Sequence, residues 1–288
     1  MHIVKLNGGL GNQMFQYAFA LALERRYGGV KLDLEWIRAE MAHNGYELDR
    51  HFRVSLPVCG ADERAALGDV DPSFFGRARR KLGLNRKSHY ISPWVSWDPE
   101  YLSVDGDRYF SGYWQSPRYY EEIEDLIRGA FEFVEPLSER NRAFLDKAAG
   151  RTLIGIHVRR GDSLRNPDFL GVCEVGYYSA AMRQASEGAR SPLFAFFSDD
   201  LDWCRDKLPA EGERIFVDWN RKEESYADMR LMIACDALVI ANSSFSWWGA
   251  WLGAGPGRRV FAPTPWFLRH RRDNPYIVPQ EWIRVPGG

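Results

Sequence analysis

The chain has 288 residues, 45% of them hydrophobic and 14% aromatic, and its formal net charge is −1 at pH 7. A chain of this length and apolar content can form one large domain or two modest domains with a substantial core. The near-neutral charge excludes a protein that binds nucleic acid through bulk electrostatic attraction.

The four cysteines are scattered, without a C-x-x-C pair or the spacing of a zinc site. We therefore expect reduced thiols and a cytoplasmic location. The chain starts directly on an apolar strand, so no signal peptide is expected, and no apolar run approaches the ~20 residues that span a bilayer. Any contact with a membrane is expected to be peripheral.

The N-terminal residues predict a β-loop-α-β unit with a glycine-rich first turn. A strand over residues 2–6 leads into the loop 7–13, and a strongly apolar helix over 14–27 follows. A glycine pair ends this helix before a second strand over 30–34.

This unit partly matches the fingerprint of a dinucleotide-binding fold. Gly9-x-Gly11 is present, and Asp33 follows at about the ~20-residue distance of a ribose-binding acid. The third small residue of the fingerprint falls on Met14, which would block the close packing of helix on strand. NAD binding is therefore disfavoured.

Residues 36–150 are less regular. A strand within 49–58 and a short helix over 61–67 are expected, and an amphipathic helix over 119–133 begins after Ser116 as its N-cap. The polar stretch before residue 150 is the predicted domain boundary, which separates residues 1–150 from residues 151–288.

A basic run and an aromatic belt lie inside this region. The run Arg77–Lys81, with Arg86 and Lys87, contains no acid, and such a run is usually a solvated face. Contact with the inner face of a membrane, or with an anionic lipid-linked acceptor, is the second interpretation. The belt, read mainly as core, comprises Tyr90, Trp94, Trp97, Tyr101, Tyr109, Phe110, Tyr113 and Trp114.

From residue 151 strands and helices alternate, which is typical of a parallel, doubly wound sheet. Strands are predicted over 152–158, 193–197, 214–217, 237–241 and 259–262, and helices over 177–188, 201–207, 225–235 and from 245. The residues from Pro263 onward are expected to pack back across the domains as a tail.

Three strand ends in this half carry polar clusters, at residues 157–162, 198–200 and 242–244. Ligands of open α/β sheets bind beyond the carboxyl ends of strands, so convergence of the three clusters predicts a site. The forked guanidiniums of Arg159 and Arg160 suit a diphosphate. The alternative is a surface ion-pair cluster in which Asp162 satisfies an arginine.

The other two clusters fit a nucleotide. Ser243 and Ser244 stand where a helix begins, so their hydroxyls, the free N–H groups and the helix dipole can hold an anion. The Asp200 carboxylate can accept from the N1–H and N2–H edge of guanine. In each case plain helix capping is the alternative.

Three D-x-D triplets raise the alternative of a divalent metal under the diphosphate, namely Asp69–Asp71, Asp105–Asp107 and Asp200–Asp202. Only the third follows a predicted strand. Because Arg159 and Arg160 already supply positive charge, a metal would be redundant, and no metal site is expected.

Five motifs resemble glycosyltransferase family 11, the α-1,2-fucosyltransferases. They are residues 7–18, 112–116, 157–162, 197–200 and 243–252, in the family's order and across nearly the whole chain. The resemblance implies an α/β, GT-B-like fold with two Rossmann-like domains facing a cleft. The N-terminal domain would serve the acceptor side, and the C-terminal domain would bind GDP-fucose.

The resemblance also implies roles for single residues. Arg159 looks like the β-phosphate ligand and, with Asn12 at the reaction centre, forms the expected catalytic pair. His157 and Asp200 look like nucleotide contacts, and Ser243 and Ser244 like phosphate contacts. Further substrate contacts in the same motifs are expected from Gly9, Gly11, Gln13, Arg160, Asp162 and Phe245.

The implied activity is metal-independent, inverting transfer of fucose from GDP-fucose to the 2-OH of a terminal galactose on an oligosaccharide or a lipid-linked glycan. No cofactor besides this donor substrate is expected. The alternatives are a transferase of another linkage or another GDP-sugar, and a glycan-binding protein without catalysis. Aromatic residues fit the last alternative, but an arginine pair opposite a helix start does not.

Overall fold

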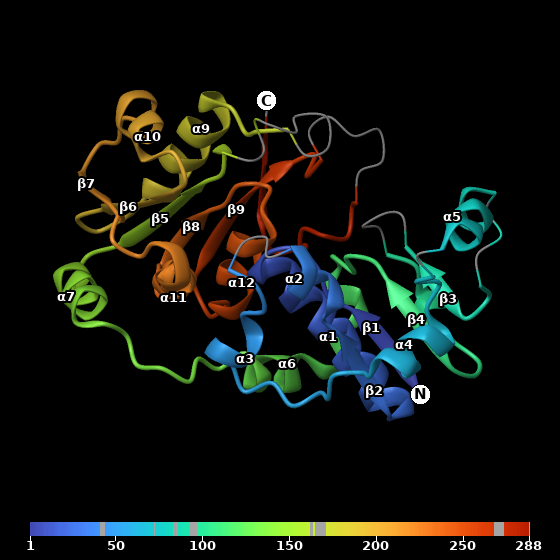
Figure 1. Ribbon diagram of the computed structural model, residues 1–288. Helices are drawn as coiled ribbons and strands as arrows, with labels where there is room; N and C mark the ends of the chain where they lie inside the picture. Colours follow the sequence, from blue (N-terminus) through green and yellow to red (C-terminus); the bar gives the residue numbers. More distant parts are fainter. Residues whose placement is uncertain are drawn as a thin grey trace. The chain divides into compact units, whose positions relative to one another are not determined.

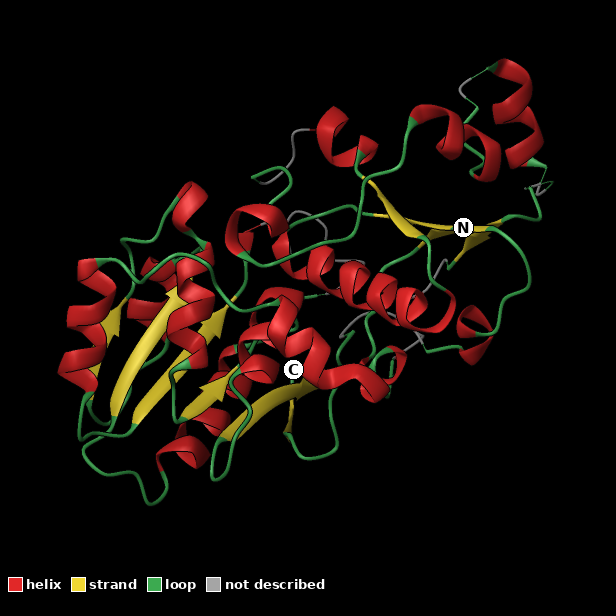
Figure 2. Ribbon diagram, turned by 90° about the horizontal axis from the view of Figure 1, so that it is seen from below, coloured by secondary structure: helices red, strands yellow, loops and turns green. Residues whose placement is uncertain are grey.

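The computed structural model describes residues 1–40, 44–71, 73–82, 84, 86–92, 97–161, 164, 171–267 and 274–287. The chain divides into two compact units, Met1–Val134 and Glu135–Gly288, each with its own β-sheet (Figure 1). Figure 2 shows the strands of each sheet in yellow, with helices around them. No helix of the described residues combines the length and the apolar character that a membrane crossing needs.

The division between the units falls before the boundary predicted at residue 150, because α7 (Glu139–Ala148) packs with the second unit. Asn141 of α7 is buried, and its amide exchanges hydrogen bonds of 3.0 and 3.1 Å with the amide of Asn220. The indole of Trp219 donates a third bond, of 2.7 Å, to the same Asn141 side chain.

The first unit contains a four-stranded parallel sheet in the order β2-β1-β4-β3. The strands are β1 (His2–Lys5), β2 (Val30–Asp33), β3 (His89–Ile91) and β4 (Arg108–Ser111). Helix α1 (Leu10–Tyr27) joins β1 to β2 and is buried from Leu10 to Leu23 apart from Asn12, so the predicted β-loop-α-β unit is confirmed.

Short helices complete this unit: α2 (Glu35–Glu40), α3 (Leu48–His51), α4 (Ala61–Leu67), α5 (Phe74–Lys81), η1 (Pro99–Leu102), η2 (Pro117–Tyr119), η3 (Glu121–Ile123) and α6 (Glu124–Ala130). The strand expected within 49–58 was wrong: this stretch starts in α3 and makes only isolated bridges at Phe52 and Val58. The helix expected over 119–133 becomes α-helical only at Glu124, and Ser116 makes no side-chain cap.

Asp33, the acid of the partial dinucleotide fingerprint, is buried inside the first unit. Its carboxylate accepts a 2.5 Å bond from the Tyr109 hydroxyl and a 3.0 Å bond from the Glu35 backbone N–H, and the Arg64 guanidinium lies 3.5 Å away. Burial, followed by the charge of Asp33, raises the pKa of Tyr109. Asp33 therefore ties β2 to β4.

In the belt, Tyr109, Phe110 and Trp114 are buried, which confirms their assignment to the core. Trp94 lies outside the described residues.

The second unit contains a six-stranded parallel sheet in the order β10-β9-β8-β5-β6-β7, which confirms the predicted doubly wound pattern. The strands are β5 (Leu153–Val158), β6 (Leu193–Ser198), β7 (Glu213–Phe216), β8 (Ala237–Val239), β9 (Arg259–Thr264) and β10 (Ile283–Pro286). The helices after α7 are α9 (Val175–Ser186), α10 (Leu201–Lys207), η4 (Lys222–Glu224), α11 (Tyr226–Ile233) and α12 (Ser244–Leu252).

Helices cover both faces of this sheet: α9 and α10 lie on one face, and α11 and α12 on the other (Figure 1). Ile154, Ile156 and Val158 of β5 pack with α9 and α10 in one buried cluster. Gly155 and His157 point to the other face, Gly155 toward Leu238 and Cys235 and His157 toward Phe245 of α12. The expected C-terminal tail was wrong in part, because β10 adds an edge strand parallel to β9.

All four cysteines are free thiols, and Cys173, Cys204 and Cys235 are buried. Burial raises the pKa of Cys173 and of Cys235 to about 12, so both remain protonated at neutral pH. They act as small core side chains.

Gly155→Ala tests the packing beneath the carboxyl end of β5. A Cβ at Gly155 would lie 2.6 Å from Leu238 Cδ1 and 2.8 Å from Cys235 Sγ. Overpacking of this kind costs about 1–3 kcal/mol, so thermal unfolding should begin at a lower temperature. Gly176→Ala in α9 is the matched control, because nothing lies within 4 Å of its added Cβ. Equal melting temperatures for the two variants would contradict this account of β5.

Candidate functional site

The three polar clusters of the second half lie side by side at one edge of the larger sheet. Strand β5 pairs with β8 on one side and β6 on the other, all in parallel. Val158 is the register partner of Ser198, and Ile156 that of Val239, so the chain leaves the three strands at nearly the same level. The predicted convergence is confirmed.

Asp199, which was not predicted as a site residue, fastens the loop that follows β5. Its carboxylate accepts backbone bonds of 2.9 Å from Arg160 and 3.1 Å from Gly161, and lies 3.2 Å from the Arg159 guanidinium. A Cβ at Gly161 would lie 2.9 Å from the same carboxylate, so a larger residue would push it away. The signal for Asp199 was its place beside Asp200, opposite two arginines.

Asp200 has the capping role that the sequence offered as one of two interpretations, and it also pairs with an arginine. One carboxylate oxygen accepts a 3.1 Å bond from the Trp203 N–H and so caps α10, which confirms the capping interpretation. The other lies 3.2 Å from Nε of Arg160. The Arg160 guanidinium stacks over the Trp203 ring, 4.1 Å from its centroid.

The two arginines are therefore not equivalent. Arg160 is held between a carboxylate and an indole, and 18% of its side chain is exposed. The Arg159 side chain is 34% exposed and pairs with Asp199 at the edge of the sheet. Arg159 is thus the better placed of the two to meet an anion from solvent.

The beginning of α12 presents its first turn without a side-chain cap. Ser243 stands at the N-cap position in extended conformation, and its hydroxyl makes no capping bond. Ser243, Ser244 and Phe245 are half-buried, while the next turn is anchored by buried Trp247 and Trp248. The Ser243 hydroxyl therefore does not cap the helix, and the positive end of the helix dipole lies after β8, the neighbour of β5 in the sheet.

His157 lies between these elements as a buried polar group. Its ring centroid is 6.0 Å from that of Phe245, and its Nδ1 has no hydrogen-bond partner among the described residues. Burial, and secondarily the charge of Arg159, lowers the pKa of His157 to about 3. The ring is therefore neutral at physiological pH and can donate or accept one bond to a ligand.

Together these groups can hold an anionic ligand: two guanidiniums, two serine hydroxyls and the uncapped start of a helix. Asp162 lies outside the described residues. No cluster of three or more potential metal ligands occurs in the described ranges. In the third D-x-D triplet, Asp200 caps α10 and Asp202 pairs with Arg205 at 2.8 Å.

The glycine-rich loop of the first unit forms a second polar group. Gly8 has a φ of +74°, and a Cβ there would lie 2.7 Å from Nδ2 of Asn12, so glycine is required next to this side chain. Gly9 is the N-cap of α1 and brings no side chain over its first turn. Oδ1 of Asn12 accepts a 2.8 Å bond from the Gln115 amide, which fixes the orientation of Asn12 and leaves Nδ2 as the donor.

Gln13, which was predicted to contact substrate, is fully buried in the structure. Its side chain has no exposed surface, and its amide nitrogen donates to the carbonyls of Gly8 at 3.0 Å and Gly45 at 2.8 Å. Its oxygen accepts from the Glu47 N–H at 3.1 Å. Gln13 therefore holds the neighbouring loop in place, and Gly11 beside it is buried within α1.

The motif over residues 112–116 continues β4 and meets the glycine-rich loop. Gln16 of α1 binds the Gly112 carbonyl at 3.1 Å and exchanges two bonds with Asn7. Trp114 has a φ of +52°, which is unusual for a bulky side chain, and its ring stacks on Phe19 at 4.1 Å. This packing positions Gln115, a partner of Asn12 that was not predicted from the sequence.

Comparison with known proteins decides the family. Residues 96–285 match the model described as Glycosyl transferase family 11. The chain belongs to glycosyltransferase family 11. It is therefore an enzyme of the glycosyltransferase class, and the matched range contains the clusters after β5, β6 and β8.

Two relatives of this family member match along almost the whole chain. An alpha-1,2-colitosyltransferase of Escherichia coli is 33% identical, with 98% of each chain covered. Galactoside alpha-(1,2)-fucosyltransferase 2 of Rattus norvegicus is 27% identical, with 99% of this chain and 77% of the relative covered.

The fold also matches a solved structure, that of the NodZ alpha-1,6-fucosyltransferase soaked with GDP-fucose. The TM-score is 0.52 at 18% identity, and the match covers 95% of this chain and 99% of the other. This likeness in fold confirms the α/β, GT-B-like class that the sequence predicts.

The neutral buried state of His157 predicts a particular dependence of stability on pH. Because the pKa of His157 lies below its unfolded value of 6.5, the unfolded chain takes up a proton between pH 6.5 and about 3 while the folded chain does not. The free energy of unfolding should therefore fall as the pH drops through this window, by about 2 kcal/mol at pH 5.

His157→Gln removes this titration and should flatten the dependence by that amount. Urea unfolding of both proteins at pH 7.5 and pH 5 measures the difference, and groups common to both cancel. Parallel losses of stability in the two proteins would show that the ring is not held neutral.

Proposed function

We propose that this glycosyltransferase moves L-fucose from GDP-fucose, with inversion, to the 2-OH of a terminal galactose. The relative of Rattus norvegicus supports the linkage and the galactoside, and the NodZ structure soaked with GDP-fucose supports the nucleotide donor. The observation that carries the proposal is the uncapped start of α12 beside the β5 arginines, since this arrangement suits a diphosphate.

The donor's diphosphate is proposed to bind between Arg159 and the first turn of α12. Ser243 and Ser244 would donate their hydroxyls and backbone N–H groups, and Arg159 its two-pronged guanidinium. Negative charge grows on the diphosphate as the bond to the sugar breaks. Because these donors are already fixed by the sheet and by Asp199, they would stabilise the departing group without rearrangement.

The nucleoside is proposed to lie toward His157, Phe245 and Asp200. The buried His157 Nδ1 needs a partner, and the half-buried Phe245 offers a ring for stacking. Asp200 carries lone pairs beyond its bonds to Arg160 and Trp203, so it can still accept from the edge of guanine. Arg160 would orient Asp200, and Asp162 would add a contact from its place in the same motif.

The first unit is proposed to serve the acceptor, which we take to be a galactose-terminated oligosaccharide or a lipid-linked glycan. Asn12 is the proposed second catalytic residue, because Gln115 fixes its amide with Nδ2 as a donor. Gly9 would let the substrate approach the backbone at the start of α1, where no capping side chain intervenes.

Transfer of another GDP-sugar is the second candidate function. The relative that is 33% identical is a colitosyltransferase, and colitose differs from fucose in lacking the hydroxyl at C3. The same diphosphate and guanine contacts would serve either donor. The choice would rest on contacts to the C3 hydroxyl.

Product analysis tests the proposal directly. The purified enzyme is incubated with GDP-fucose or GDP-colitose and a set of galactose-terminated acceptors, and NMR determines the linkage and anomeric configuration of each product. Fucose in α linkage to O2 of galactose is expected. If only colitose is transferred, the donor is GDP-colitose and not GDP-fucose. If the product has another linkage, the acceptor hydroxyl is not the 2-OH. If neither donor gives a product, the proposal is overturned.

Arg159→Lys retains the charge and removes the fork. Loss of one pre-organised donor to the leaving group lowers kcat by on the order of 10²–10³-fold. The melting temperature should hardly change, since a partly exposed ion pair contributes about 0–1 kcal/mol. Arg183→Lys, on an exposed part of α9, is the control and should behave as wild type. A near-normal kcat, or a variant that unfolds, would remove Arg159 from the diphosphate.

Activity should survive an excess of EDTA, because guanidiniums and the helix start already neutralise the diphosphate. Turnover is measured with EDTA, and then with Mn²⁺ or Mg²⁺ added back. Complete loss that either ion restores would transfer the charge-neutralising role to a metal and revive Asp200–Asp202 as its ligands.

A further inference from the structure

We propose that α5 and the residues after it form a docking surface for an anionic lipid bilayer. The surface consists of Phe74, Phe75, Arg77, Lys81, Leu82, Leu84 and Lys87, and we call it the α5 surface. It goes beyond the sugar transfer, because it concerns where the enzyme works.

The α5 surface contains the most exposed large hydrophobic side chains of the described residues. Phe75 is 81% exposed, Phe74 75%, Leu82 74% and Leu84 62%. Burial of apolar surface is the main driving force of folding, so four such side chains within one short stretch call for a partner.

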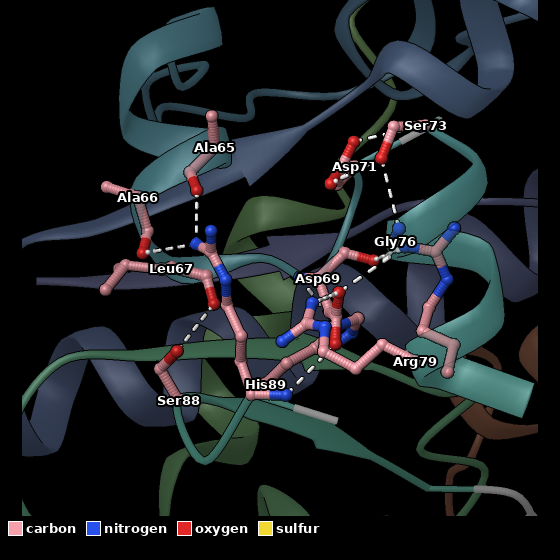
Figure 3. A network of polar contacts seen from close by, with 12 residues as sticks. Ala65, Ala66, Leu67, Asp69, Asp71, Ser73, Gly76, Arg79, Ser88 and His89 are labelled. Carbon is pink, nitrogen blue, oxygen red and sulfur yellow. Dashed lines mark hydrogen bonds and ion pairs between the residues drawn. The ribbon is translucent and has the colours of Figure 1, made fainter. Parts of the chain in front are cut away.

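The face of α5 that points away from these exposed side chains holds the helix to the first unit (Figure 3). Gly76 is buried there, and a Cβ on it would lie 2.6 Å from the Asp71 carbonyl, so the backbone of α5 packs directly on residue 71. Ser73 caps the helix by accepting a 3.0 Å bond from the Gly76 N–H. Asp71 in turn accepts two 2.9 Å bonds from Ser73.

The buried carboxylate of Asp69 neutralises the inward-facing arginines. Asp69 pairs with Arg79 and, at 3.4 Å, with Arg80, and it also accepts a 3.0 Å bond from the Arg86 backbone. Its backbone N–H donates to Nδ1 of His89, 3.0 Å away. Burial lowers the pKa of His89 to about 4, which keeps the ring neutral. The orientation of α5 is therefore fixed by buried groups.

Helical geometry then fixes what faces outward. Each residue turns by about 100°, so the side opposite Gly76 carries Phe74, Ala78 and Lys81, flanked by Phe75 and Leu82 on one side and by Arg77 on the other. This is an apolar stripe beside a basic edge. Such an arrangement is typical of helices that lie in a membrane interface, where aromatic rings enter the headgroup region and basic groups meet lipid phosphates.

The positive charge of the α5 surface favours an anionic lipid bilayer as its partner. Residues 74–87 contain no Asp or Glu. Arg77, Lys81 and Lys87 are exposed and make no ion pair with any described residue. Lysine is depleted at protein–protein interfaces, whereas basic residues close to an apolar stripe are attracted to anionic lipid.

Co-sedimentation of the full chain with vesicles tests the proposal. Phosphatidylcholine vesicles are compared with vesicles that also contain phosphatidylglycerol. Stronger binding to the anionic vesicles is expected, and it should weaken as salt screens the basic residues. Binding at background level, or equal binding to both kinds of vesicle, would overturn the proposal.

Two double variants separate the apolar and the basic contributions. Phe74→Ser/Phe75→Ser should lower the partition coefficient by about tenfold or more. Arg77→Glu/Lys81→Glu should remove most of the preference for phosphatidylglycerol, since each basic charge contributes about fivefold.

The matched controls are Leu126→Ser/Val134→Ser, for exposed apolar residues elsewhere on the first unit, and Arg25→Glu/Arg38→Glu, which changes the net charge equally. Both should bind as wild type, and equal losses in the controls would overturn the assignment to α5.

Two more measurements distinguish membrane docking from a defect in catalysis and from self-association. All α5 variants should keep wild-type turnover of a water-soluble acceptor, so a loss of vesicle binding does not bear on the sugar transfer. Sedimentation velocity should give the same oligomeric state for wild type and the Phe74→Ser/Phe75→Ser variant. A shift to smaller species without any vesicle binding would show that the surface joins two copies of the chain and would refute membrane docking.

Discussion

The parallel pairing of β8, β5 and β6 is the constraint on which the candidate donor site depends. Because these neighbours run in the same direction, the segments after them leave the sheet together. Asp199 then fastens the loop after β5 by accepting from two backbone N–H groups and pairing with Arg159. Arg159 and Arg160 are thereby fixed at the carboxyl edge of the sheet by Asp199 and Asp200.

The same carboxylates stabilise the fold and shape the site. Asp200 caps α10 and orients Arg160, so the helix and the guanidinium are positioned by one side chain. The start of α12 differs from that of α10, because the Ser243 hydroxyl at its N-cap makes no capping bond. Buried tryptophans one turn later hold the helix instead. The missing side-chain cap is a local cost of about 1 kcal/mol, which a bound anion would offset.

Sequence patterns predicted the second unit well, because each buried strand there is a continuous apolar run that ends in polar residues. They were less successful where long-range contacts decide the structure. Residues 49–58 read as a strand but lack a neighbour to pair with along their length, and 117–123 form 3₁₀ turns around the buried Tyr119 and Tyr120. The residues from Pro263 onward were predicted to form a tail, yet β10 pairs with β9 at the edge of the sheet.

The same distinction applies to the candidate site. Arg159, Asp200 and Ser243 could be selected from local sequence, since each follows a recognisable strand. Gln115 could not, because its importance lies in a partner 103 positions away. Asp199 had only its place beside Asp200 as a signal, since its partner Arg159 is 40 positions away. The burial of Gln13 could not be predicted either, since two of its side-chain partners, residues 45 and 47, are distant in sequence.

Calorimetric titration of GDP tests the central claim most directly, that the edge formed by β8, β5 and β6 is a guanosine diphosphate site. GDP should bind to the wild-type protein more tightly than ADP, and Arg159→Ala should lose most of that affinity while remaining folded. A folded wild-type protein that gives no heat with GDP, or a variant that binds GDP as well as wild type, would contradict the account.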